Sequence, residues 1–357
     1  MNEIAIRRGR RPGQTKRITL KAVADAAGVS MMTVSNVIHN RANVSAALRE
    51  QVEKQIEALG YVPNRAAQEL AGNARPHIGL LYQATTNPFI AAVIVGAMKA
   101  ASRLRVDVSV QLARIDDPKA LRDTVHLMEV GGVEGFLLPS PMAEAMALAC
   151  KKKPIEVPMV AIAPGHPIAG MGAVRCDEVQ AARELVALLI AEGHRNIGHL
   201  AGPEAQSGSA ARLQGYKEAL KAAGLKLRPE DIVRSPAYRF QEGVKAAEAL
   251  LQARPGLTAI FAANDTLAAA VLAVAHRRGI EVPRQLSVVG YDDSPVAEQV
   301  WPGLTTIHQD AEALTEQAVE LLEKAVRSWR ADRAVLPGDD VVLPFQMVRR
   351  GSVAAPE

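Results

Sequence analysis

The segment Thr19-Leu-Lys-Ala-Val-Ala-Asp-Ala-Ala-Gly-Val-Ser-Met-Met-Thr-Val-Ser-Asn-Val-Ile38 decides how the amino-terminal part of the chain folds. Thr19 and Ser30 each stand as an N-cap directly before apolar residues at helical spacing, so each begins a short helix. Gly28 supplies the tight turn between the two helices, where a side chain would crowd the second one. The segment therefore predicts two helices joined by a turn.

These helices are expected over residues 20–27 and 31–38, and a third over residues 46–59, after the N-cap Ser45 and before the stop signal Gly60. Each helix presents one apolar face to a common core. The core positions are Val23, Ala27, Val34, Val37, Ile38, Val52, Ile56 and Leu59. The start of the chain is thus predicted to be a small all-α unit.

Charge is concentrated in the same part of the chain. Residues 1–75 hold 12 Lys/Arg against 6 Asp/Glu, whereas the remaining residues hold 30 against 32. A basic head on a near-neutral body is typical of a protein whose head contacts a polyanion. A charged tail that only improves solubility is the alternative interpretation of the charge alone.

From residue 76 onward the pattern changes to short apolar runs that alternate with helical stretches. The runs are 78–82, 106–112, 135–138, 159–163, 197–201, 259–263, 286–291 and 341–345. Helical spacing is clearest at 89–104, 181–192, 210–223 and 267–278. This alternation predicts an α/β core of doubly wound parallel sheets, and roughly 275 residues are enough for two lobes.

Several protein classes are excluded by what the sequence lacks. The two cysteines, Cys150 and Cys176, have no spacing that suits zinc or a disulfide framework, so we expect no metal site. No uncharged apolar run approaches the roughly 18 residues of a membrane span. Residues 1–17 lack the apolar core of a secretion signal, so we expect a cytoplasmic protein.

An enzyme with a dinucleotide site is one competing interpretation of the α/β pattern. No Gly-x-Gly-x-x-Gly follows an expected strand, and the phosphate-loop, Gly-x-Ser-x-Gly and His-Glu-x-x-His motifs are missing. We therefore expect no enzyme, no catalytic residues and no cofactor. A sugar-binding transport protein is a second competitor, but it would need an export signal and would not carry residues 18–72.

Residues 18–36, together with Val44-Ser45 and residues 59–72, closely resemble the lactose-repressor (LacI/GalR) family of transcription regulators. Further landmarks similar to the family's are Asn87-Pro88-Phe89, Gly193-His194, Ala201-Gly202-Pro203, Ala263-Asn264-Asp265, the stretch 287–293 and Leu304-Thr305-Thr306-Ile307. The resemblance implies a DNA-binding repressor that forms a homodimer. It also implies a core shaped like periplasmic sugar-binding proteins, with a ligand between its two lobes.

The expected domains follow from this resemblance. A basic, disordered arm (1–17) precedes a helix-turn-helix headpiece (18–62), and a hinge helix with its linker (63–75) leads into the core (76–350). The amino-terminal lobe is expected at about 76–175 and 309–337, the carboxyl-terminal lobe at about 176–306 and 339–350, and a tail at 351–357. The tail is too short for a heptad helix, so we expect no oligomer beyond the dimer.

The second helix of such a headpiece enters the DNA major groove and presents its first residues to base edges. The expected DNA contacts are Ser30, Met31, Met32, Thr33, Ser35 and Asn36. Ser30 and Thr33 suit phosphates, the methionines suit thymine methyl groups, and Asn36 suits adenine. Many family members carry Arg at the position of Asn36, so the pseudo-palindromic operator is expected to differ from the common family site.

The resemblance also assigns DNA contacts to the short hinge helix, at Asn64, Ala67 and Leu70. Leu70 would wedge into a central minor-groove step, although simple packing against its own domain is the alternative. So short a helix is marginal alone, which makes it a candidate switch. The arm at 1–17 is expected to add salt-dependent phosphate attraction, and a misassigned start codon is the other interpretation.

The expected effector-binding residues are Asn87, Phe89, Arg212, Tyr238, Asn264 and Asp292. Asn264 and Asp292 follow expected strands, where ligands of parallel sheets bind, and the others match family positions. A structural ion pair is the alternative for Arg212 and Asp292, and core packing is the alternative for the two aromatic residues. The polar set favours a sugar or sugar derivative; a nucleobase or nucleoside, or no small-molecule effector, remain the alternatives.

Overall fold

The computed structural model describes residues 19–38, 44–59, 61, 75–84, 87–151, 154–335 and 338–357. The chain divides into two compact units, Met1–Ala74 and Arg75–Glu357. The predicted basic arm and the hinge contacts Asn64, Ala67 and Leu70 lie outside the described residues.

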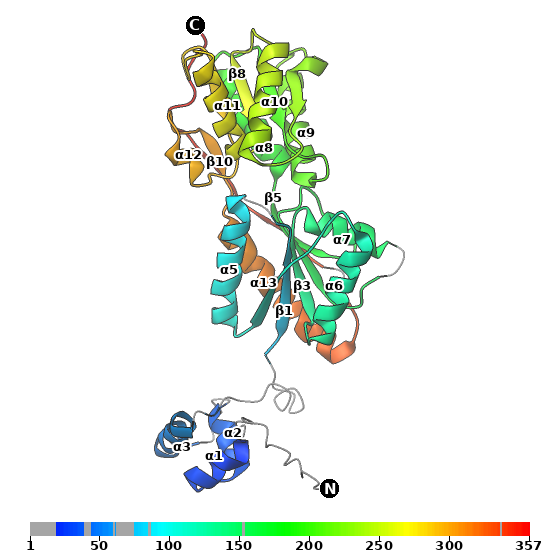
Figure 1. Cartoon of the computed structure of the whole chain (residues 1–357), viewed down its shortest axis with the longest axis vertical. Helices are drawn as coiled ribbons and strands as arrows, with labels where there is room; N and C mark the ends of the chain where they lie inside the picture. The colour runs from blue at the N-terminus through cyan, green and yellow to red at the C-terminus, as the bar shows by residue number, and fades with distance from the viewer. Residues whose placement is uncertain are drawn as a thin grey trace, which may run out of the picture. The chain divides into compact units, whose positions relative to one another are not determined.

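The first unit contains α1 (Leu20–Ala27), α2 (Met31–Ile38) and α3 (Ala46–Leu59), which match the spans predicted from the caps (Figure 1). Each helix begins at a predicted cap: the hydroxyl groups of Thr19, Ser30 and Ser45 accept the N–H of the residue three positions on, at 3.3, 3.1 and 3.4 Å. Gly28 adopts a left-handed φ of 63°, which favours glycine. The buried core consists of Val23, Ala24, Ala27, Val34, Val37 and Val52.

The first lobe of the second unit is built on a six-stranded parallel sheet in the order β11-β5-β4-β3-β1-β2. The strands are β1 (His77–Tyr82), β2 (Asp107–Leu112), β3 (Gly135–Pro139), β4 (Met159–Ile162), β5 (Gly172–Cys176) and β11 (Asp340–Leu343). One face packs against α5 (Pro88–Leu104) and α13 (Ala311–Asp332). The other face packs against α6 (Pro118–Val130) and α7 (Met142–Cys150), so helices cover both faces (Figure 1).

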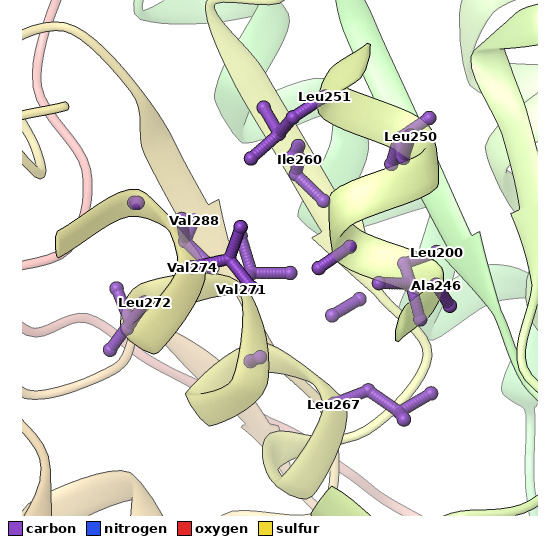
Figure 2. Packing of buried hydrophobic residues seen from close by; sticks show 14 of the residues in the cluster. Leu200, Ala246, Leu250, Leu251, Ile260, Leu267, Val271, Leu272, Val274 and Val288 are labelled. Carbon is purple, nitrogen blue, oxygen red and sulfur yellow. The ribbon is translucent and has the colours of Figure 1, made fainter. Parts of the chain in front are cut away.

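The second lobe repeats this plan with a four-stranded parallel sheet in the order β7-β6-β8-β9. Its strands are β6 (Ile197–Ala201), β7 (Ile232–Arg234), β8 (Ala259–Ala262) and β9 (Ser287–Val289). α8 (Glu178–Ala191) and α9 (Ser207–Ala222) cover one face. α10 (Phe240–Ala253) and α11 (Asp265–Arg277) cover the other, and Figure 2 shows their leucine and valine side chains packed against Ile260 and Val288 of the sheet.

The smaller elements are the 3-10 turn η1 (Pro229–Asp231), the short helix α12 (Val296–Gln299) and an antiparallel pair formed by β10 (Thr306–His308) and β12 (Gln346–Val348). No helix within the described residues has both the length and the apolar character needed to cross a lipid bilayer.

The chain crosses between the lobes at three places: from β5 to α8, from β10 to α13, and from β11 to β12. Residues 339–350 do not belong entirely to the second lobe, contrary to the expectation from the sequence. β11 pairs in parallel with β5, with Val341 opposite Val174, and so completes the sheet of the first lobe. Only the residues after β11 return to the second lobe, where β12 pairs with β10.

Candidate functional site

The surface of α2 combines buried and exposed positions in the way that a groove-reading helix requires. Val34 and Val37 are 0% and 4% exposed, whereas Met31 and Met32 are 52% and 74% exposed. Exposed methionines are costly unless something covers them, since their apolar surface faces water. The two methionines therefore present apolar surface to solvent, and their contact with bases stays a prediction.

The polar residues of α2 lie at its N-cap and along its first two turns. The Ser30 hydroxyl accepts the Thr33 N–H and lies 2.9 Å from the Thr33 hydroxyl, so both are held at the start of the helix. Ser35 and Asn36 are half-buried on the same helix. The backbone N–H groups at a helix start attract anions, which suits the phosphates expected near Ser30 and Thr33.

A cavity of ≈ 200 Å³ lies between the two lobes of the core. Its wall is formed by Gln83, Ala84, Asn87, Phe89, Ile90, Ile115, Pro139, Ser140, Pro141, Met142, Ala163, Pro203, Ala205, Gln206, Gly208, Arg212, Pro236, Ala237, Tyr238, Arg239, Asp292 and Gln309. Nearly all of these residues lie just beyond the carboxyl end of a strand or in the first turns of the helix that follows. That edge is where parallel sheets bind ligands.

The first lobe contributes a largely apolar wall. Phe89 and Ile90 of α5, Ile115 after β2 and Met142 of α7 line it. Asn87 is the N-cap of α5, and its Oδ1 accepts the Phe89 N–H at 3.1 Å. This cap fixes the first turn of α5, from which Phe89 reaches the cavity.

The second lobe contributes the charged wall, centred on Arg212. Arg212 is only 6% exposed, and its guanidinium donates from Nε and Nη2 to the two carboxylate oxygens of Glu178, at 2.5 and 3.1 Å. Nη1 donates to the Ala263 carbonyl at 2.5 Å, and the guanidinium carbon lies 3.8 Å from the centre of the Tyr291 ring. Arg212 is therefore fixed from several sides, with Asp292 as a more distant partner at 3.8 Å.

Asp292 lines the cavity on a strained loop. Its φ of 104° is rare for a residue with a side chain, and such strain is found most often at functional sites. Its Oδ1 accepts the Gln309 Nε2 at 2.7 Å, and its backbone N–H donates to the Ile307 carbonyl at 2.9 Å. Burial raises the pKa of Asp292 to about 6, although Arg212 acts in the opposite direction.

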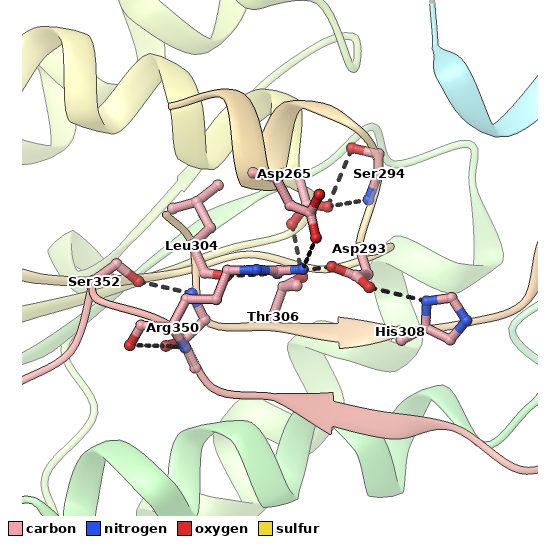
Figure 3. Close-up of polar contacts among 10 residues, drawn as sticks. Asp265, Asp293, Ser294, Leu304, Thr306, His308, Arg350 and Ser352 are labelled. Carbon is pink, nitrogen blue, oxygen red and sulfur yellow. Dashed lines mark hydrogen bonds and ion pairs between the residues drawn. The ribbon is translucent and has the colours of Figure 1, made fainter. Parts of the chain in front are cut away.

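The loop that carries Asp292 is held by a polar network beneath it (Figure 3). Asp265 accepts the Ser294 N–H at 2.7 Å and the Thr306 hydroxyl at 2.7 Å, and Asp293 pairs with His308 at 3.0 Å and Arg350 at 2.7 Å (Figure 3). Burial, and then the charge of Asp292, raise the pKa of Asp265 to about 7. These contacts join the start of α11, β10 and the carboxyl-terminal segment to the loop.

The Tyr238 side chain lines the cavity and packs directly against the backbone of Gly202. A Cβ on Gly202 would lie 2.3 Å from the Tyr238 hydroxyl, so only glycine leaves room for the phenol. Tyr238 is 8% exposed, and burial raises its pKa to about 12. The phenol is therefore neutral and supplies both an aromatic face and a hydroxyl group.

The structure brings together five of the six predicted effector residues: Asn87, Phe89, Arg212, Tyr238 and Asp292 all line the cavity. Asn264 does not. It is 1% exposed, and its Oδ1 caps α11 by accepting the Leu267 N–H at 3.0 Å. The structure therefore places Asn264 at the helix cap and outside the cavity lining, and its contact with an effector stays a prediction.

Several polar residues in or beside the cavity were not predicted from the sequence, among them Gln309 in its wall and Glu178 behind Arg212. Gln309 lines the cavity two residues after the Leu304–Ile307 landmark, and its Oε1 is enclosed without a hydrogen-bond partner among the described residues. Its nearness to that landmark was an available signal. Glu178 precedes Arg212 by 34 residues, and no local pattern predicts their pairing.

Comparison with known proteins identifies the family. Residues 19–64 match the model for bacterial regulatory proteins of the lacI family, and residues 186–353 match that for a periplasmic binding protein-like domain. The HTH-type transcriptional regulator CelR of Thermobifida fusca is 34% identical over 328 residues, which cover 86% of this chain and 91% of that protein. The chain belongs to the LacI family.

Other LacI-family proteins give the same result over almost the whole chain. The ribose operon repressor of Haemophilus influenzae is 32% identical and covers 87% of this chain and 92% of its own length. A lac repressor dimer bound to operator and an anti-inducer is 28% identical, with a TM-score of 0.80 and coverage of 95% and 100%. A CelR–cellobiose complex is 31% identical, with a TM-score of 0.69 and coverage of 94% and 100%. This LacI-family chain is a DNA-binding transcription regulator and not an enzyme.

Proposed function

We propose that this regulator is a repressor that binds a pseudo-palindromic operator as a homodimer and changes its operator affinity when a sugar or sugar derivative enters the cavity. The observation that supports this most directly is the contrast between the two cavity walls. Phe89, Ile90 and Met142 form an apolar surface opposite the polar groups of Arg212, Asp292 and Gln309.

A sugar ring suits such a pair of walls. Its C–H faces pack against aromatic and aliphatic side chains, whereas its hydroxyl groups both donate and accept hydrogen bonds. Asp292 accepts, Arg212 donates, and Gln309 offers an enclosed oxygen that lacks a donor among the described residues. A nucleobase is the competing ligand class, since a relative from Photobacterium profundum is named the transcriptional repressor PurR.

For the DNA side, we propose that Ser30, Met31, Met32, Thr33, Ser35 and Asn36 contact the operator. The exposure of both methionines on α2 supports this assignment. Asn64, Ala67 and Leu70 of the proposed hinge at 63–75 are added from the family resemblance alone. The headpiece at 18–62 and the core at 76–350 then act as separate reading and sensing domains, and a regulator of chromosomal operators acts in the cytoplasm, at the nucleoid.

The homodimer is supported by apolar side chains on the core surface. Val95 and Met98 of α5 are each 44% exposed, and Leu112 on the neighbouring edge strand β2 is 49% exposed. Trp301 is 91% exposed in the second lobe. Large apolar side chains of this kind are typical of a surface that another chain covers. Light scattering of the purified protein should therefore give the mass of a dimer.

A two-step experiment tests the proposal. A thermal-shift screen first compares cellobiose, ribose and other sugars with adenine and guanine, because a ligand that binds the folded state raises the melting temperature. Operator DNA is then selected from a random library, and its affinity is measured with and without the ligand found. A sugar that shifts both melting and operator affinity supports the proposal. A response to nucleobases alone, or to none of these compounds, contradicts the sugar assignment.

A further inference from the structure

Glu144 connects the two lobes beside the cavity. It lies on α7 of the first lobe, and its Oε1 accepts the Ser140 hydroxyl at 2.8 Å within that lobe. The same oxygen accepts the N–H of Ser207 at 3.3 Å and the Ser207 hydroxyl, both from α9 of the second lobe. A single carboxylate oxygen thus joins the two walls.

This contact completes a helix end that its own lobe leaves open. The N-cap of α9 is Gln206, which makes no side-chain capping bond. A helix start carries unsatisfied N–H groups and a partial positive charge, and a carboxylate nearby compensates both. Glu144 supplies that carboxylate from the other lobe, so the cap of α9 exists only while the lobes are together.

The backbones of the two lobes also touch at Gly165, in the loop after β4. Its N–H donates to the Ser207 hydroxyl at 2.8 Å. A Cβ on Gly165 would lie 2.3 Å from the Ser207 carbonyl oxygen and 2.7 Å from the Gly208 nitrogen. Because backbone atoms cannot yield as a side chain can, any larger residue at 165 must push the lobes apart.

The two oxygens of Glu144 act in opposite directions on the contact between the lobes. Glu144 Oε2 is enclosed and has no hydrogen-bond partner within the described part of the chain. Burying half of a carboxylate without a partner is costly, and this oxygen regains water when the lobes separate. The bonds of Oε1 favour the closed arrangement, and the bare Oε2 opposes it.

We propose that Glu144, Ser207 and Gly165 form an interlobe latch, and that Glu144 is a positioning residue that links lobe closure to effector binding. This proposal rests on the proposed function in one respect: an effector must contact both walls. A ligand of that kind binds only the closed arrangement, so its apparent affinity falls with the closed fraction. Weakening the latch therefore weakens binding, although Glu144 and Gly165 do not line the cavity.

Hydrogen–deuterium exchange of the full chain tests the latch without any ligand. The variants are Gly165→Ala and Glu144→Gln. Matched controls are Gly256→Ala, where a Cβ meets nothing within 4 Å, and Glu230→Gln on the exposed η1 turn. In the latch variants, exchange in residues 204–212 should rise at least about fivefold, while α10 and α11 keep wild-type protection. Unchanged exchange in 204–212, or an equal rise throughout the core, would overturn the latch.

Isothermal titration with cellobiose and with ribose separates this proposal from the proposed function. If either sugar binds the wild type, both latch variants should bind it at least about tenfold more weakly, and both controls should bind it equally well. Equal binding by wild type and latch variants would overturn the link to effector binding. If neither sugar binds the wild type, the sugar assignment fails for these probes, and the exchange experiment alone decides whether the latch exists.

Discussion

Arg212 is held by Glu178 more closely than by Asp292: its guanidinium bonds both Glu178 oxygens at 2.5 and 3.1 Å, whereas Asp292 lies at 3.8 Å. The structural ion pair anticipated for Arg212 therefore exists, but with a different partner. Asp292 accepts Gln309 Nε2 at its Oδ1 and lines the cavity. Glu178 therefore fixes the guanidinium, whereas Asp292 forms part of the cavity wall.

Replacing Glu178 should damage the fold as well as the site. Glu178→Gln leaves the buried Arg212 without its compensating charge, and breaking a buried pair from one side costs about 3 kcal/mol. Urea unfolding should show this loss in the free energy of unfolding. Glu242→Gln removes an exposed pair with Lys245 and should cost less than about 0.5 kcal/mol. Similar losses in both variants would refute the special role of Glu178.

Asp292→Asn should change how stability depends on pH. The folded pKa of about 6 lies above the ordinary value of 3.8, so the contribution of Asp292 to stability is fully present below about pH 4 and is lost as pH rises through about 6. The amide avoids that loss. The variant should therefore gain about 1–3 kcal/mol relative to wild type at pH 8, with the difference shrinking toward pH 4. A difference that is constant from pH 4 to 8 would show that Asp292 does not titrate in this way.

Such a gain in stability should come with a loss of effector binding. Buried carboxylates with raised pKa values cluster at functional sites, where stability is lost in favour of ligand recognition. Operator binding in the absence of effector should stay near wild type, because Asp292 lies in the core and not in the headpiece. An unchanged response to effector would remove Asp292 from the site.

Gly202→Ala should move Tyr238 out of the cavity wall. The new methyl group would overlap the phenol, and overpacking of this kind costs about 1–3 kcal/mol. The melting temperature should fall, and the near-ultraviolet circular dichroism signal of the tyrosines should change. Gly256→Ala, which adds a methyl group into open space, serves as the control and should leave both measurements unchanged.

Asn36→Arg should alter the operator preference at one base pair. Asn pairs best with adenine and Arg with guanine, and each such pair discriminates by about 1–3 kcal/mol. Selection from a random DNA library should show an adenine-to-guanine change at one symmetric position of each half-site. The same change in preference in a Lys54→Arg variant on α3 would argue against a direct role of Asn36.

The sequence predicted local features best. The spans of α1, α2 and α3 match because Thr19, Ser30 and Ser45 are caps, and a cap depends only on the next three residues. β7, β10 and β12 were missed, and each has only three residues, too few to show a period; β5, with five residues, was missed as well. The assignment of β11 to the second lobe was wrong. Its partner strand β5 lies more than 160 residues earlier in the chain, so no local pattern indicates the pairing.

The site residues show the same contrast between local features, which the sequence predicts, and contacts distant in the chain, which it does not. Residues beside a strand end or a family landmark, such as Phe89 and Asp292, were found and line the cavity. Asn264 was predicted as a ligand contact, although an Asn directly before a helical stretch is also a local cap signal, and in the structure its oxygen caps α11. Glu178 and Glu144 were missed because their roles arise from contacts between helices that are distant in the chain.

The position of β11 also sets the order in which the protein is completed during synthesis. Because the chain crosses between the lobes three times, neither lobe is one continuous stretch of polypeptide. The first lobe lacks its edge strand until residues 340–343 leave the ribosome, by which point all four strands of the second lobe's parallel sheet have been made. The core of a nascent chain therefore cannot fold completely before β11 has been synthesised. A transcript truncated before β11 yields neither a complete first lobe nor a closed cavity.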